Sequence, residues 1–126
     1  MKHAMIGLTM GAALFAVPGF AQTQMTPDDA VSAARNQLGV LEYCRDEGHI
    51  DGTAAETQTR ILGMMPDATD QARVDAAYEK GKTGTVSALG VEQSLSESAS
   101  AQGTDEAALC TQMAAMLAQA AAQLPN

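Results

Sequence analysis

Cys44 and Cys110 are the only cysteines in the 126-residue chain, and they are its only side chains able to form a covalent cross-link. A cysteine thiolate can also act as a nucleophile or a metal ligand. An oxidising compartment favours the disulfide, which would close a loop of about 67 residues and contribute roughly 4 kcal/mol to stability. We predict that the two cysteines are joined; free thiols and a shared metal site are the alternatives.

Potential metal ligands concentrate in residues 44–52, a segment with a cysteine, a histidine and several carboxylates. Zinc would require Cys44, His49 and two further well-placed groups. A calcium loop starting at Glu47 would need a carboxylate at its third position and a glutamate at its twelfth, where the chain has His49 and Gln58. Neither pattern is complete, so we interpret the segment as a solvated helix end and turn and expect no metal site.

Two short motifs resemble pieces of enzyme active sites. Residues 81–83 read Gly-Lys-Thr, like the end of a phosphate-binding loop, but that loop needs a glycine where this chain has Ala76. Tyr78 and Lys82 stand four residues apart, as in some dehydrogenases, but no dinucleotide-binding fingerprint accompanies them. The chain also offers too little apolar surface to enclose a pocket that would raise the pKa of a carboxylate. We therefore expect neither an enzyme nor a bound cofactor.

Residues 1–21 have the three-part plan of a secretory signal peptide. A short basic start precedes an uncharged, mostly apolar run at residues 4–17, which is too short to span a membrane. Small residues, Gly19 and Ala21, occupy the -3 and -1 positions of a cut after Ala21. We predict a cleaved signal peptide, a single helical domain at residues 22–126, and a periplasmic or secreted location.

The chain is acidic, with a formal net charge of -8 at pH 7 and a sequence pI near 4.4. Such a charge repels phosphates and argues against an electrostatic nucleic-acid binder. Both phenylalanines, Phe15 and Phe20, lie in the predicted signal peptide, so Tyr43 and Tyr78 are the only aromatic residues left after cleavage. This composition excludes a large aromatic core and a multidomain enzyme.

Helix signals recur throughout the predicted domain. Thr26 can cap a helix that continues through Pro27 and two aspartates, and apolar residues follow at helical spacing until Gly48. The same signals predict helices at residues 53–65 and 68–80, a short helix near Ala99, and a last helix at residues 107–124. We expect no strand, with residues 85–89 the segment closest to an exception. The predicted fold class is therefore all-α, a small bundle of four to five helices clasped by one disulfide.

The last predicted helix carries no charge from Ala107 to Asn126. Its large apolar side chains form one stripe, a candidate membrane or partner face, and the glutamines at positions 112, 119 and 123 share another face. The stripe consists of Leu109, Met113, Met116, Leu117 and Leu124. Two interpretations stay open: the central helix of a soluble bundle with its glutamines at the surface, or a membrane-active helix that assembles around a glutamine-lined centre.

Three stretches of the chain carry a family resemblance. Residues 34–44, 80–88 and 108–113 include both cysteines and the basic glycine turn between them. They resemble a family of small exported bacterial proteins commonly labelled pore-forming proteins of the six-kilodalton early-secreted-antigen class. The resemblance covers most of residues 22–126 and implies a small helical exported protein that permeabilises membranes. No residue matches a pore motif, so the resemblance assigns no role to an individual side chain.

Three functions are compatible with these features. The first is a periplasmic interaction or binding module without enzymatic activity, whose methionines supply an adaptable apolar surface for a protein partner or a second copy. The second is a membrane-active, pore-forming oligomer that acts through the last helix at low pH, where the carboxylates lose their charge. The third is an acid-stress periplasmic chaperone, based on 15 carboxylates, a weak core and one disulfide. The methionines of the first hypothesis are Met64, Met65, Met113 and Met116.

Overall fold

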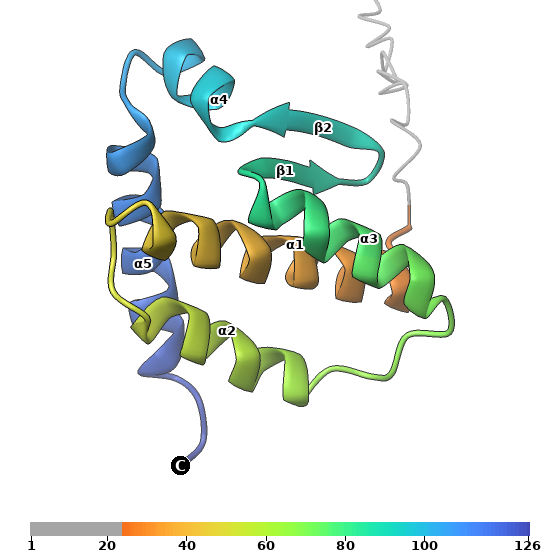
Figure 1. Cartoon of the computed structure of the whole chain (residues 1–126). Coiled ribbons are helices and arrows are strands. Elements are labelled where there is room, and N and C mark those ends of the chain that lie inside the picture. The colour runs from red at the N-terminus through yellow and green to blue at the C-terminus, as the bar shows by residue number, and fades with distance from the viewer. Residues whose placement is uncertain (1–23) are drawn as a thin grey trace, which may run out of the picture.

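The computed structural model describes residues 24–126, which form five helices and one two-stranded antiparallel sheet (Figure 1). In chain order the elements are α1 (Pro27–Asp46), α2 (Thr53–Gly63), α3 (Gln71–Lys82), β1 (Thr85–Ala88), β2 (Val91–Ser94), α4 (Leu95–Ala101) and α5 (Glu106–Ala121). The predicted class, a helical bundle clasped by a disulfide, is confirmed. The predicted signal peptide and its cleavage site lie outside the described residues.

The first helix, α1, begins as its sequence predicts. Thr26 Oγ1 accepts a hydrogen bond from the backbone N–H of Asp29 at 3.1 Å, and Asp29 Oδ2 accepts one from the backbone N–H of Thr26 at 3.0 Å. This reciprocal capping box satisfies two amides that would lack partners, and Pro27 fits because the first turn needs no N–H from it. The helix ends at Asp46, and Gly48, with a φ of +79°, turns the chain away.

Helices α1 and α3 run parallel and approach until their backbones touch (Figure 1). A Cβ on Gly39 would lie 2.3 Å from the carbonyl oxygen of Tyr78, and one on Gly81 would lie 2.2 Å from the carbonyl oxygen of Asn36. Glycine is therefore required on both sides of the crossing. The expectation that the third helix stops before Gly81 is wrong: the helix continues to Lys82, because this glycine permits a close helix contact instead of breaking the helix.

The side chain of Asn36 joins three elements at this crossing. It is 2 % exposed, and its Nδ2 donates hydrogen bonds of 2.9 Å to the carbonyl oxygens of Ala77 and Thr85. Its Oδ1 accepts a 2.9 Å hydrogen bond from the backbone N–H of Ser87. A single buried amide thus fixes the position of β1 against α1 and α3.

Residues 85–94 form a hairpin, so the expectation of no strand is wrong. β1 pairs with β2 in a register that sets Thr85 opposite Ser94, and the two-residue turn has positive φ at Leu89 (+52°) and Gly90 (+80°). Two positive φ angles match the twist of a tight hairpin, although leucine is an uncommon first residue for one. The strands are only four residues long, and β2 (Val-Glu-Gln-Ser) lacks apolar alternation, so their pairing depends on the contacts that hold β1 to the helices.

The other helix boundaries follow from caps and prolines. The N-caps are Asp70 for α3, Ser94 for α4 and Asp105 for α5. α3 therefore begins after its cap at Gln71, later than predicted. α2 ends at Gly63 and α5 at Ala121, slightly earlier than predicted, and Pro66 and Pro125 lack the N–H groups that would continue the helical hydrogen bonds to Leu62 and Ala121.

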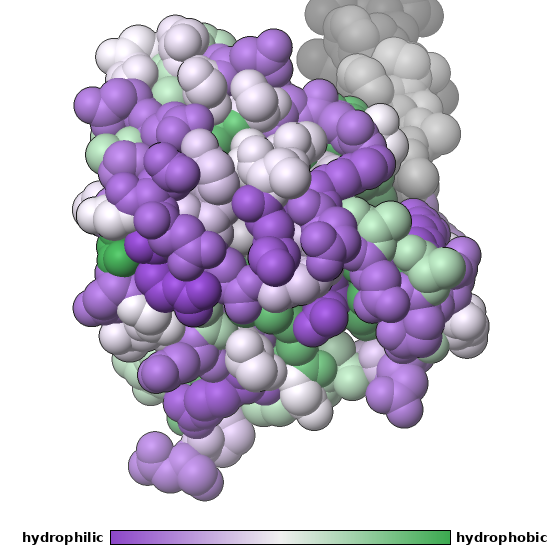
Figure 2. Space-filling model, in the orientation of Figure 1, coloured by the Kyte–Doolittle hydropathy of each residue, from purple (hydrophilic) through white to green (hydrophobic). Residues whose placement is uncertain are grey.

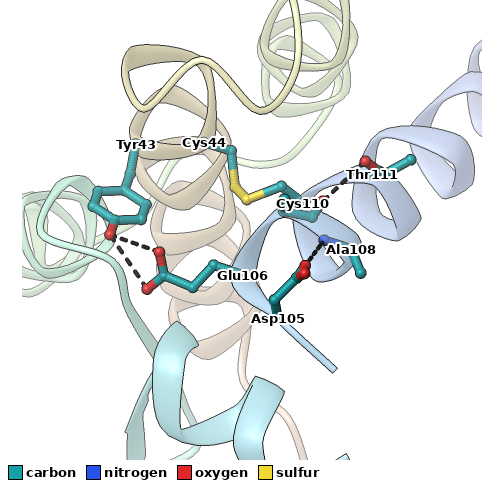
Figure 3. Close-up of a disulfide and its surroundings, with 8 residues drawn as sticks. Tyr43, Cys44, Asp105, Glu106, Ala108, Cys110 and Thr111 are labelled. Carbon is teal, nitrogen blue, oxygen red and sulfur yellow. Dashed lines mark hydrogen bonds between the residues drawn. A yellow bond between two sulfur atoms is a disulfide. The ribbon is translucent and has the colours of Figure 1, made fainter. Parts of the chain in front are cut away.

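The predicted disulfide between Cys44 and Cys110 is confirmed (Figure 3). The two Cα atoms lie 5.7 Å apart and both side chains are fully buried, so the bond joins the last turn of α1 to the start of α5 inside the core. Beside it, the Tyr43 hydroxyl donates to the Glu106 carboxylate, with oxygen–oxygen distances of 3.1 and 3.3 Å. Burial and then this carboxylate raise the pKa of Tyr43.

Most of the buried apolar residues fall into two clusters. One surrounds the disulfide and includes Val40, Leu95 and Leu109. The other lies between α1, α2 and α5 and includes Leu41 and Leu117. α5 therefore contributes to both clusters along one face, and that face is its connection to the rest of the fold.

Candidate functional site

The apolar stripe of the last helix is divided between core and surface. Leu109 and Leu117 are buried, with 7 % and 4 % of their surface exposed, and Met113 packs against both core clusters. Leu124, beyond the end of α5, is half-buried. Met116 is the member that remains at the surface, with 59 % of its area exposed.

The glutamines at the end of the chain lie at the surface. Gln112 and Gln119 of α5 are exposed, and so is Gln123 just beyond the helix. Figure 2 shows that one face of the molecule is mostly hydrophilic, with apolar side chains confined to small patches. Within residues 24–126 the exposed large apolar side chains are Met25, Met64, Leu89, Val91 and Met116.

Met116 forms one side of an apolar groove of about 430 Å³ between α1, α2 and α5. The side chains that shape this groove are Met25, Ala30, Ala34, Ile61, Met65 and Met116. We call it the methionine groove. No residue that lines it carries a charge, and its polar lining consists of Gln37 and Gln58. Gln58 is buried and donates from Nε2 to the carbonyl oxygen of Ala34 at 2.9 Å, so its amide is already satisfied.

The groove exists because of helix phase and residue size. Met116 and Leu117 are adjacent in the sequence, so they point about 100° apart on α5, with the leucine directed into the core and the methionine onto the rim. The facing surface of α1 carries alanines such as Ala30 and Ala34, which leave the space between the helices unfilled. Methionine suits such a rim, because its flexible thioether can adapt to differently shaped apolar partners.

Sequence reasoning found part of this site. Of the four methionines considered as a partner surface, Met65 and Met116 line the groove, Met113 lies against the core, and Met64 is 56 % exposed but does not line it. It missed Met25, which is 55 % exposed. A signal was present: Met25 precedes the cap of α1 at the position that commonly packs against the fourth helical residue, and that residue, Ala30, shares the groove.

The other motifs are accounted for by packing. The sulfur of Cys44 is bonded to Cys110, and residues 24–126 contain no cluster of three or more histidine, cysteine or acidic side chains suited to a metal ion. Lys82 Nζ lies 5.6 Å from the centre of the Tyr78 ring. The Tyr78 hydroxyl donates to Glu42, and this hydrogen bond, followed by burial, raises the pKa of Tyr78 to about 12. The tyrosine–lysine pair is thus a cation–π contact, with the hydroxyl directed to a carboxylate.

Two further findings bear on the family resemblance. Within the described part of the chain, no helix is both long enough and apolar enough to cross a bilayer. No family model, curated protein or solved structure matches the chain. The resemblance to exported pore-forming proteins stays a prediction, and the methionine groove is an open, uncharged concavity on the described surface.

Proposed function

We propose that the protein is a non-enzymatic interaction module whose methionine groove binds an apolar segment of a basic partner protein. One observation carries the proposal: the exposed side chains of Met25 and Met116 meet Met65 around a single uncharged opening. Isolated apolar residues at a surface are ordinary, but several that converge on one concavity mark a site for contact with another molecule.

The shape and the charge of the chain define the partner. A volume of about 430 Å³ accommodates a few apolar side chains, such as those that one face of a helix presents. The uncharged lining would leave a buried charge without a partner, so charged groups of the partner must stay outside the groove. A net charge of -8 steers positively charged proteins toward the molecule, so basic residues beside the apolar segment would accelerate association.

The membrane-active alternative requires a larger rearrangement. Leu109 and Leu117 are buried, and the disulfide at Cys110 holds the start of α5 against α1. Insertion of the α5 stripe into a bilayer would remove these leucines from both core clusters. Binding at the groove needs no such opening, which favours the interaction module.

The test measures binding of a defined peptide to the oxidised protein at pH 7 by fluorescence anisotropy. The probe is a labelled amphipathic helix of leucine and lysine, and a second peptide with the same lysines but serine in place of leucine controls for charge. We expect the leucine peptide alone to bind measurably. Met116→Ser should weaken it about tenfold, since burial of a methionine contributes about 1.5–3 kcal/mol. Met64→Ser is the matched control, because Met64 is 56 % exposed and lies outside the groove lining.

Three results would contradict the proposal. Equal binding of the two peptides would show that charge alone drives association. Equal losses in the Met116→Ser and Met64→Ser variants would place binding elsewhere. If neither peptide binds and the protein releases dye from anionic vesicles at pH 7 or 4.5, the membrane-active alternative replaces the interaction module. If neither peptide binds and the protein suppresses client aggregation at pH 3 but not at pH 7, the acid-stress chaperone replaces it instead.

A further inference from the structure

A second cavity, of about 240 Å³, lies between α1, α3 and the turn of the hairpin, and its lining differs in kind from the methionine groove. Two ion pairs stand in its wall, one between Arg73 and Asp29 and the other between Lys80 and Glu92. Arg73 and Lys80 are seven residues apart on α3, which corresponds to about 10 Å along the helix. The cavity therefore has a charged pair toward each end, with the alanines of α3 between them.

The two pairs differ in the hydrogen-bonding capacity that they leave over. Asp29 is fully engaged, because its Oδ2 accepts from the backbone and hydroxyl of Thr26 and its Oδ1 accepts from Arg73. Arg73 uses one side-chain N–H of its five in this pair, so it can still bind an incoming carboxylate. At the other pair, Lys80 bonds Oε1 of Glu92, and Oε2 has no partner among residues 24–126. The Arg73 end thus offers donors only, whereas the Glu92 end offers an acceptor together with the two remaining N–H groups of Lys80.

The hydroxyl of Ser32 is the polar group that the fold leaves unsatisfied in this wall. Ser32 is 8 % exposed, lies one helical turn from Asp29, and its buried Oγ has no hydrogen-bond partner within the described part of the chain. A buried hydroxyl without a partner is destabilising, so such groups are rare in folded proteins. Because this oxygen is itself inaccessible to solvent, the Ser32 side chain must rotate toward the cavity before a carbonyl oxygen of a ligand can accept its hydrogen bond.

We propose that this cavity binds a short peptide of small residues, with its C-terminal carboxylate at Arg73 and its N-terminal ammonium at Glu92. The wall carries two cations and two carboxylates, so a ligand with one charge of each sign preserves the balance, whereas a dianion would add to a chain charge of -8. Three extended residues span about 10 Å, the separation of the two pairs. The volume is below that of pockets for drug-sized ligands, which restricts the side chains to small ones.

The experiment follows backbone amide signals by two-dimensional NMR while trialanine is added to the oxidised protein at pH 7. We expect saturable shifts in residues 87–92 and along α3, with a dissociation constant of about 1 mM or tighter. N-acetyl-trialanine lacks the ammonium and trialanine amide lacks the carboxylate, so each should bind about tenfold more weakly, the scale of one lost charge-assisted hydrogen bond. The spectra of all variants also report whether each one is folded.

Variants identify which end of the peptide lies where. Arg73→Gln should weaken trialanine binding about tenfold but leave trialanine amide, already deprived of its carboxylate, unchanged. Glu92→Gln should likewise weaken trialanine binding about tenfold but leave N-acetyl-trialanine, already deprived of its ammonium, unchanged. Arg45→Gln is the matched control, because Arg45 is similarly exposed (44 % against 48 % for Arg73) and pairs with Asp46 away from this cavity.

Any of three results overturns the proposal. These are no saturable shift at millimolar trialanine, equal binding of the blocked and unblocked peptides, and shifts confined to the methionine groove. The two cavities are probed by different peptides and different variants. A negative trialanine titration therefore leaves the proposed function of the methionine groove intact, and a negative result with the leucine–lysine peptide leaves the proposed tripeptide site intact.

Discussion

Replacing Gly39 by alanine tests the close crossing of α1 and α3. The new Cβ would lie 2.3 Å from the carbonyl oxygen of Tyr78 and 2.9 Å from the backbone nitrogen of Lys82. Both neighbours are backbone atoms, so rotating a side chain cannot relieve the contact. α1 and α3 must instead move apart by roughly 1 Å to reach an ordinary van der Waals distance.

Three contributions set the size of the effect. Overpacking costs about 1–3 kcal/mol, and a clash with backbone belongs at the upper end. Separation of the helices also stretches the hydrogen bonds from Asn36 to Ala77 and Thr85, each worth about 1 kcal/mol. The higher helix propensity of alanine returns about 1 kcal/mol. We therefore expect Gly39→Ala to lower the free energy of unfolding by about 2–4 kcal/mol.

Urea unfolding followed by far-ultraviolet circular dichroism measures this difference, with thermal melting as a second readout. The melting temperature should fall by roughly 10–30 °C for a domain of this size. Gly63→Ala is the control: Gly63 also lies in a helix, but an added Cβ would meet no atom within 4 Å. That variant should be as stable as the wild type or more stable, by up to about 1 kcal/mol. If Gly39→Ala were as stable as Gly63→Ala, the backbone contact between α1 and α3 would be refuted.

Three further predictions concern polar groups and the cross-link. Asn36→Ala should lower the free energy of unfolding by about 3 kcal/mol in urea titrations, because three backbone groups, one in a buried and two in partly buried hydrogen bonds, lose their partner. Cys44→Ala combined with Cys110→Ala should cost roughly 4 kcal/mol in the same assay, and a reducing agent should have no effect on that variant. Hydrogen bonds from Thr26 and then from Arg73 hold the pKa of Asp29 at about 2. The ionised Asp29 carboxylate therefore stabilises the fold above pH 3.8, its pKa in the unfolded chain, and this stabilisation is lost as pH falls through about 2. Asp29→Asn should therefore be less stable than the wild type at pH 7, and melting curves of the two should converge near pH 2.

Much of the helical framework could be predicted because its signals are local. Thr26 and Pro27 mark the start of α1, and Gly48 marks its end, through contacts that span only a few residues. The disulfide was predictable for a different reason: with a single pair of cysteines, only one connectivity is possible.

The features that were missed depend on contacts between distant segments. Gly81 looks like a helix breaker until Asn36, distant in the sequence, is seen to lie against it. The second strand of the hairpin lacks apolar alternation, and the tight turn begins with Leu89 at positive φ. Contacts with the helices hold this hairpin in place, because Thr85 and Ser87 both bond to the buried amide of Asn36.

The scarcity of large apolar residues strengthens the case for the groove. This fold is held by small residues that let backbones approach, by a buried amide and by a disulfide, so each large side chain that it buries matters. Met116 is nevertheless left at the surface beside Leu117, because the disulfide at Cys110 and the buried Leu109 fix which face of α5 points inward. Met25 is likewise exposed at the opening of the same groove. Since neither side chain adds much to the core, the proposed contact with a partner gives them a role that the stability of the chain does not.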